Sequence, residues 1–144
     1  MPTENATDSE IVEALTKLVT DGIVAGTFVI LEGGPTRNYY IQFAVQGGRL
    51  FCEAVSNQYL EPQDQLDDAQ LRALENLGWR EPEHEAQNWF RTFRPNDPDD
   101  YIAIVGITRR AFTDVFRLPA NGPLVMTRSW EGQVLVPEVE IRFA

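Results

Sequence analysis

The sequence predicts an α+β fold in which helices pack on an antiparallel sheet. Three strand-like runs follow one another at residues 28–31, 39–45 and 50–55, with turn signals between them. Three helical segments with apolar faces lie outside this group of strands. This segregation favours α+β, and the expected order is α-β-β-β-α-β-α-β, followed by a C-terminal strand.

The chain length indicates one domain. A protein of 144 residues is of the usual size for a single domain and buries enough surface to fold without disulfides or a metal. We expect residues 1–144 to form this domain, with a flexible N-terminus at 1–7 and a strand-like C-terminal extension at 131–144.

The composition predicts a soluble cytoplasmic protein. The formal net charge is −10, which argues against binding to nucleic acid or to anionic membranes, because both need clustered Lys and Arg. The N-terminus has no hydrophobic signal segment, and no apolar run approaches the roughly 18 residues of a membrane span. A single cysteine, Cys52, fits a reducing compartment. The acidic surface either maintains solubility or attracts basic partners.

The first helix is marked by a capping box. Thr7 and Glu10 have the required spacing. The apolar residues Ile11, Leu15, Leu18 and Val19 then recur at helical spacing. They predict an amphipathic helix that ends near Gly22.

A hairpin is predicted between the second and third strands. Gly47-Gly48 separates two runs rich in aromatic and β-branched residues. Both central positions of a type I′ turn need positive φ, which glycine adopts without strain.

The second helix has signals at both ends. Asp67 is a candidate N-cap with Gln70 at the third position, and Leu71, Leu74 and Leu77 supply the apolar stripe. Gly78 occupies the position of a left-handed C′ residue, which predicts a Schellman ending with Trp79 as C″.

The third helix begins with Asp97 as N-cap and Pro98 at N1. We expect it to end before Leu118-Pro119. Its predicted apolar stripe comprises Tyr101, Ile104, Val105, Thr108, Ala111, Phe112, Val115 and Phe116.

Three further segments are strand-like, at residues 88–94, 124–127 and 139–143. The last alternates apolar residues with Glu140 and Arg142. An alternating strand at a chain end joins its own sheet or offers an edge to another chain. We therefore expect either a homodimer or a tail that closes the edge of the sheet.

The residues that usually carry chemistry form no recognisable constellation. His84 is the only histidine and lies in a polar loop, and Cys52 lies in an apolar run. One histidine and one distant cysteine cannot supply the three or four ligands of a zinc site. The aspartates near 64–68 and 97–100 lie at helix starts, where capping explains them. The sequence therefore predicts no enzyme activity and no cofactor.

Aromatic residues cluster around the junction between the second helix and the fourth strand. Trp79, Trp89, Phe90 and Phe93 either pack in the core or line an exposed groove for a peptide. The sequence does not separate these alternatives. The candidate protein-binding residues are Tyr59, Trp79, Trp89 and Phe90.

An ordered set of segments over roughly residues 8–130 resembles the TY-Chap domain proteins, which are similar to YbjN and to type III secretion chaperones of the Tir-chaperone type. The segments are Tyr40-Ile41-Gln42-Phe43, Glu53 to Leu60, Leu77-Gly78-Trp79 with Pro82, Asn88-Trp89-Phe90-Arg91 and Ala111 to Phe116.

This resemblance implies a secretion-chaperone-like α+β fold in a small, acidic, cytoplasmic bacterial protein. It also implies a non-enzymatic chaperone or adaptor that binds a segment of a client protein, often as a homodimer. At the positions matching the family motif, we expect structural roles first for Asn57, Gly78, Trp79 and Trp89. The alternative function is a small-molecule-sensing or regulatory domain with a pocket between helix and sheet.

Overall fold

The computed structural model describes residues 5–21, 28–34, 36–84, 87–120, 122–130 and 133–134. The predicted order of helices and strands is confirmed. The elements are α1 (Asp8–Asp21), β1 (Phe28–Gly33), β2 (Tyr39–Gln46), β3 (Arg49–Ala54), the 3-10 turns η1 (Asn57–Tyr59) and η2 (Pro62–Asp64), α2 (Asp68–Asn76), β4 (Trp89–Phe93), α3 (Pro98–Arg110), the π-helical turn η3 (Ala111–Val115), β5 (Val125–Trp130) and β6 (Gln133–Val134).

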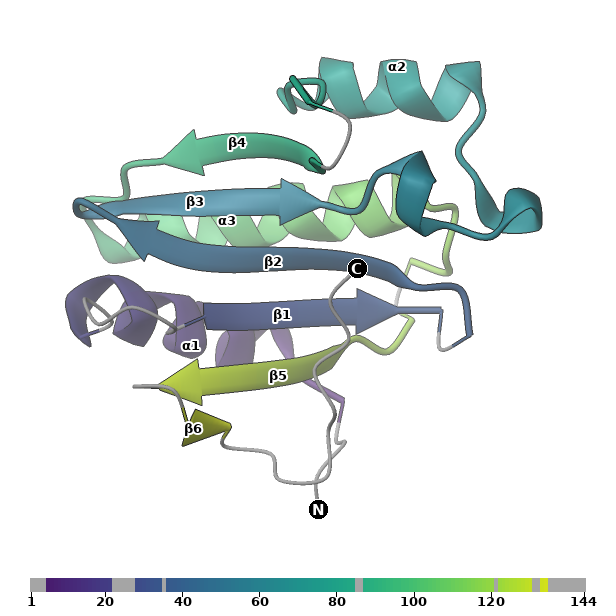
Figure 1. Ribbon diagram of the computed structural model, residues 1–144. Coiled ribbons are helices and arrows are strands. Elements are labelled where there is room, and N and C mark those ends of the chain that lie inside the picture. The colour runs from purple at the N-terminus through teal and green to yellow at the C-terminus, as the bar shows by residue number, and fades with distance from the viewer. Residues whose placement is uncertain are drawn as a thin grey trace.

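The described strands form one six-stranded antiparallel sheet in the order β4-β3-β2-β1-β5-β6 (Figure 1). The three strands predicted to be consecutive are neighbours in this sheet. Gly47 and Gly48 both have positive φ, 57° and 77°, so the predicted hairpin between β2 and β3 is confirmed.

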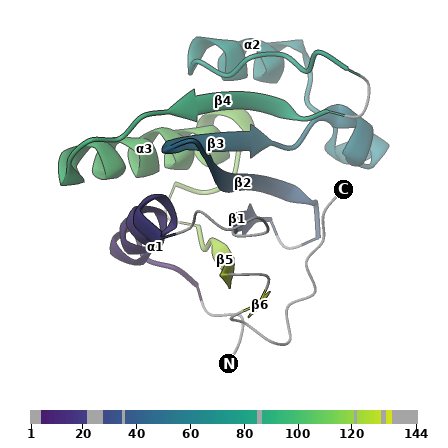
Figure 2. The same ribbon diagram turned by 60° about the vertical axis from the view of Figure 1, so that its left-hand side comes forward.

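Two helices cover one face of the sheet. Helices α1 and α3 lie side by side on that face, and α2 lies beyond the β4 edge (Figures 1 and 2). An ion pair between Arg109 Nε and Asp8 Oδ1 (2.8 Å) joins α3 to α1. No described helix lies on the opposite face, which we call the helix-free face.

The alternation of side chains decides which residues reach each face. In β3, Leu50, Cys52 and Ala54 are buried, whereas Phe51 and Glu53 are only half-buried. Side chains directly opposite in an antiparallel pair share a face. The helix-free face therefore carries Phe51 and Glu53 of β3, together with their β4 partners Thr92 and Phe90.

The helix starts are fixed by capping boxes. The backbone N–H of Glu10 donates to the hydroxyl oxygen of Thr7 (3.1 Å), and that of Thr7 donates to Oε1 of Glu10 (2.8 Å). Asp67 with Gln70 forms the same arrangement at α2, and Asp97 with Asp100 at α3. The three predicted N-caps are confirmed.

The end of the third helix differs from the regular α-helix that the apolar stripe predicts. After Arg110 the chain widens into η3, in which the N–H of Phe116 donates to the carbonyl of Ala111 (3.0 Å). Arg117 then adopts a positive φ of 59° and ends the helix. The wider turn still buries Ala111, Phe112 and Val115, because apolar spacing alone does not distinguish an α-turn from a π-turn.

The two chain ends are described only in part. Asn5 pairs with Val125 in a β-bridge, and the N–H of Ala6 donates to the carbonyl of Leu124 (2.8 Å). The predicted strand at 139–143 lies outside the described residues. Within the described ranges, no helix has the length and apolar character needed to cross a membrane.

The second helix ends in the predicted Schellman motif. The N–H of Trp79 donates to the carbonyl of Leu74 (3.1 Å), and that of Gly78 donates to the carbonyl of Glu75 (2.9 Å). Gly78 has a φ of 101°, which side chains with a Cβ strongly disfavour. The turn sends the chain from α2 back toward β4.

We predict that Gly78→Ala lowers the free energy of unfolding by about 1 kcal/mol or more, because the positive φ strains a residue with a Cβ. The new Cβ would also lie 2.8 Å from Nη1 of Arg91. The matched control is Gly106→Ala at an exposed position of α3, where a Cβ meets nothing within 4 Å. This control should stabilise the protein by about 0.5–1 kcal/mol. Chemical denaturation measures both values, and equal effects of the two substitutions would contradict the assignment.

Candidate functional site

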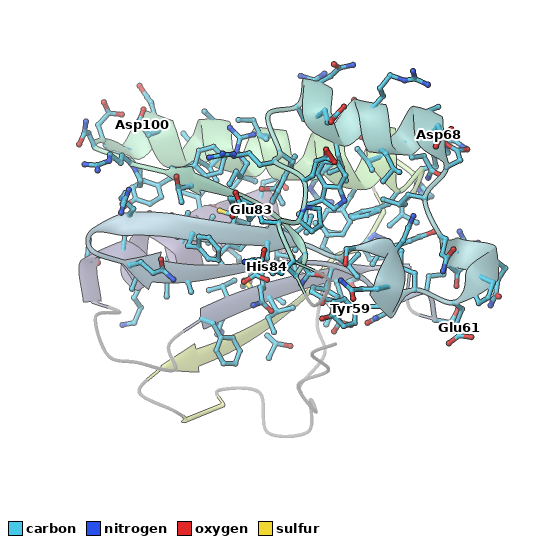
Figure 3. The ribbon with its side chains drawn as sticks, turned by 45° about the horizontal axis from the view of Figure 1, so that its top comes forward. Tyr59, Glu61, Asp68, Glu83, His84 and Asp100 are labelled. Atoms are coloured by element: carbon cyan, nitrogen blue, oxygen red, sulfur yellow. The ribbon has the colours of Figure 1, made fainter. Side chains whose placement is uncertain are left out.

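A hollow of about 240 Å³ opens on the helix-free face beside β3 and β4. Two aromatic residues and four polar ones line it. Part of its wall comes from the loop between α2 and β4, whose residues Glu83 and His84 are labelled in Figure 3. The lining residues are Phe51, Glu53, Glu83, Gln87, Asn88 and Phe90.

The two phenylalanines form the apolar part of the hollow. The rings of Phe51 and Phe90 stack with centroids 6.4 Å apart and an interplanar angle of 27°. Arg80 approaches from the loop, with its guanidinium carbon 5.4 Å from the centroid of Phe90. Backbone hydrogen bonds in both directions between Arg80 and Phe90 (2.9 and 3.1 Å) fix this segment along β4.

A buried amide organises the polar part of the hollow. The Asn88 Oδ1 accepts the backbone N–H of Ser56 (3.0 Å), and Nδ2 donates to the Tyr40 hydroxyl and to Glu53 Oε1, both at 3.2 Å. The Ser56 hydroxyl donates to the carbonyl of Gln87 (3.0 Å). These bonds tie the end of the loop to β2 and β3. They also restrain the Glu53 carboxylate.

A second, more open depression adjoins the hollow. It has a volume of about 550 Å³ and shares Glu83 with the hollow. Its lining residues are Glu75, Trp79, Arg80, Glu81, Pro82 and Glu83. The two concavities therefore meet at Glu83.

The four candidate binding residues do not form one exposed cluster. Trp79 and Trp89 are buried in the core, with exposed fractions of 3% and 6%. Phe90 is half-buried and lines the hollow, whereas Tyr59 is half-buried in η1. The tryptophans therefore pack as core residues, and binding by any of the four stays a prediction.

Trp79 and Arg91 connect α2 to the helix-backed face of β4. The guanidinium carbon of Arg91 lies 4.3 Å from the ring centroid of Phe93 and 5.9 Å from that of Trp79. Its Nη1 donates to the carbonyl of Leu77 at the end of α2. Burial lowers the pKa of Arg91. These contacts give Trp79 a structural role.

Asn57 also has a structural role. Its Oδ1 accepts the N–H of Leu66 (2.7 Å), and its Nδ2 donates to the carbonyl of Leu66 (3.0 Å). The side chain thereby closes the segment that contains η1 and η2. Asn57 therefore matches the family motif as a residue that stabilises the fold.

The sequence predicts no catalytic or metal-binding role for His84 or Cys52. His84 is exposed in the loop, and Cys52 is buried, where desolvation raises the pKa of its thiol far above the usual range. A thiol that stays protonated is a poor nucleophile. Among the residues that the structure describes, no three or more His, Cys, Asp or Glu residues are grouped to hold a metal ion.

Several residues of the hollow are not among the candidates that the sequence predicts. Phe51 and Glu53 lie two residues apart in the strand-like run at 50–55 and share a face. Spacing of two along a strand was therefore a usable signal. The role of Asn88 depends on contacts to Tyr40 and Glu53, which are remote in the sequence, so no local pattern indicated it.

A helix-backed antiparallel sheet with this hollow defines an α+β domain with a concave surface suited to binding. Residues 9–129 match the family model TY-Chap3, described as "T3SS (YopN, CesT) and YbjN peptide-binding chaperone 3". The chain belongs to this family of peptide-binding chaperones, which confirms the resemblance predicted over residues 8–130. No curated protein and no solved structure gives a significant match.

We predict that Asn88→Ala lowers the free energy of unfolding by about 2 kcal/mol, because it leaves buried polar partners without their hydrogen bonds. The control is Gln58→Ala, which removes an exposed amide that donates to Gln87 of the same loop. Its effect should stay within about 0.5 kcal/mol. Thermal and urea unfolding compare the variants. A neutral Asn88→Ala would show that the amide does not hold the loop to the sheet.

Proposed function

We propose that this protein is a non-enzymatic chaperone or adaptor domain that binds an extended segment of a client protein at the hollow. Membership of a peptide-binding chaperone family supports this function. The observation that supports the location is the pair of stacked, half-buried rings of Phe51 and Phe90, bordered by polar side chains. Aromatic residues in concave sites are frequent anchors for protein partners.

The size of the hollow favours a side chain as its occupant. Its 240 Å³ is below the roughly 300–1,000 Å³ of sites that enclose small molecules. The neighbouring depression is larger but more open. An extended segment can place alternate side chains over such shallow sites. The alternative of a small-molecule-sensing domain has no supporting observation.

The β4 edge favours docking on the face of the sheet over addition of a strand at this edge. The N–H and C=O of Phe90 on the outer side of β4 are already bonded to Arg80. A client strand would have to displace this bridge before it could pair with that position. Side-chain recognition in the hollow requires no such displacement.

The proposal includes a homodimer in the bacterial cytoplasm, with protein segments rather than nucleic acid or membranes as partners. The net charge of −10 supports the choice of partner, because it repels phosphate groups. The dimer rests on the alternating segment at 139–143, which follows β6 in the chain.

Static light scattering should give a dimer mass for the full chain and a lower mass after removal of residues 132–144. A full-length monomer would contradict the dimer.

We predict that Phe51→Ala and Phe90→Ala each weaken client binding about tenfold, because each removes one of the two rings that anchor the segment. The client segments are first selected on an array of short peptides, and their dissociation constants are measured by fluorescence anisotropy. Ile102→Ala is the matched control, since Ile102 is 59% exposed and belongs to α3 on the other face of the sheet.

Circular dichroism melts confirm that each variant is folded before binding is compared. Equal binding by the Phe51, Phe90 and Ile102 variants would show that clients bind elsewhere. An array without any bound peptide would contradict the function itself.

A further inference from the structure

The charges around the hollow are mainly negative. Glu53 and Glu83 line the hollow, and Glu75 and Glu81 line the adjoining depression. Arg80 is the one cation among the described lining residues of both concavities. A neutral or acidic client segment gains no electrostatic attraction from these negative charges. A basic segment gains both attraction and specificity.

We infer that the hollow selects a basic side chain, arginine above lysine, from a client segment in which basic and apolar residues alternate. This inference rests on the proposed function, because it names the chemistry of the segment bound at the same site. In an extended segment, alternate side chains point to the same side. One basic residue can then enter the hollow while a second reaches Glu75 or Glu81.

The aromatic rings are suited to a guanidinium. A planar cation is attracted to the face of a phenylalanine ring at distances up to about 6 Å. The chain itself supplies an example, since Arg80 lies 5.4 Å from the centroid of Phe90. Phe51, stacked beside Phe90, offers a client arginine the same kind of contact.

Glu53 supplies a charge that is positioned before the client arrives. Its Oε1 accepts a hydrogen bond from Asn88 Nδ2 at 3.2 Å. The amide is neutral, so it orients the carboxylate without cancelling the negative charge. A carboxylate that is already restrained loses less side-chain entropy on binding than a mobile one. It can pair with a guanidinium in a charge-assisted hydrogen bond.

The test uses three fluorescein-labelled peptides whose valines alternate with arginine, glutamine or glutamate. The full-length protein should bind the arginine peptide most tightly and the glutamate peptide least. The double variant with Glu53→Gln and Glu83→Gln should weaken binding of the arginine peptide about fivefold, with little effect on the glutamine peptide. Added NaCl should weaken the binding of the arginine peptide but not that of the other two peptides.

Two further variants separate local recognition from general attraction by an acidic protein. Arg80→Gln removes the competing cation and should tighten binding of the arginine peptide. Glu53→Gln and Glu13→Gln each remove one negative charge, but Glu13 is an exposed residue of α1 on the other face of the sheet, so only Glu53→Gln should weaken binding of the arginine peptide. Both effects are measured by anisotropy on protein whose thermal unfolding matches the parent.

The outcomes distinguish failure of the inference from failure of the proposed function. If the glutamine and arginine peptides bind equally and Phe51→Ala weakens both, the site binds peptides but has no basic preference, and the inference is wrong. If Glu13→Gln weakens binding as much as Glu53→Gln, only net charge acts, and the inference is again wrong. If no peptide binds, both the inference and the proposed function are wrong.

Discussion

Side chains alternate between the two faces of every strand, and the described helices of this sheet cover one of those faces and not the other. Burial of Leu50 and Cys52 against the helices is the main apolar gain available to β3. The same register forces Phe51 and Glu53 to the helix-free face. The hollow is thus a consequence of how the core is packed, and a register shift of one residue would remove it and expose the core together.

The ending of α2 supplies the other half of the site. The left-handed Gly78 reverses the chain, Trp79 enters the core, and Arg80 pairs along the outer edge of β4. The loop then returns through Asn88, whose amide is bonded to β2 and β3. Local backbone conformation and one buried polar network therefore position the acidic and aromatic groups of the hollow.

Much of the fold could be predicted because its signals are local. Capping at Asp67 and the positive φ at Gly78 involve neighbouring residues, so short sequence patterns suffice. The site was harder to predict, because it depends on strand pairing between residues distant in sequence. Trp89 and Phe90 are adjacent aromatics, yet one is buried in the core and the other lines the hollow. Alternation along β4 places the two rings on opposite faces, and the register of β3 against β4 decides which of them meets the core.

The central claim is that a client segment binds on the helix-free face, between β3 and the loop that leads into β4. Nuclear magnetic resonance titration of the isotopically labelled full chain with the arginine–valine peptide tests it most directly. The account predicts that backbone amide shifts concentrate in β3, in β4 and at residues 87–88, while α1 and α3 change little. Shifts concentrated on the exposed surfaces of α1 and α3, with β3 and β4 unchanged, would contradict it.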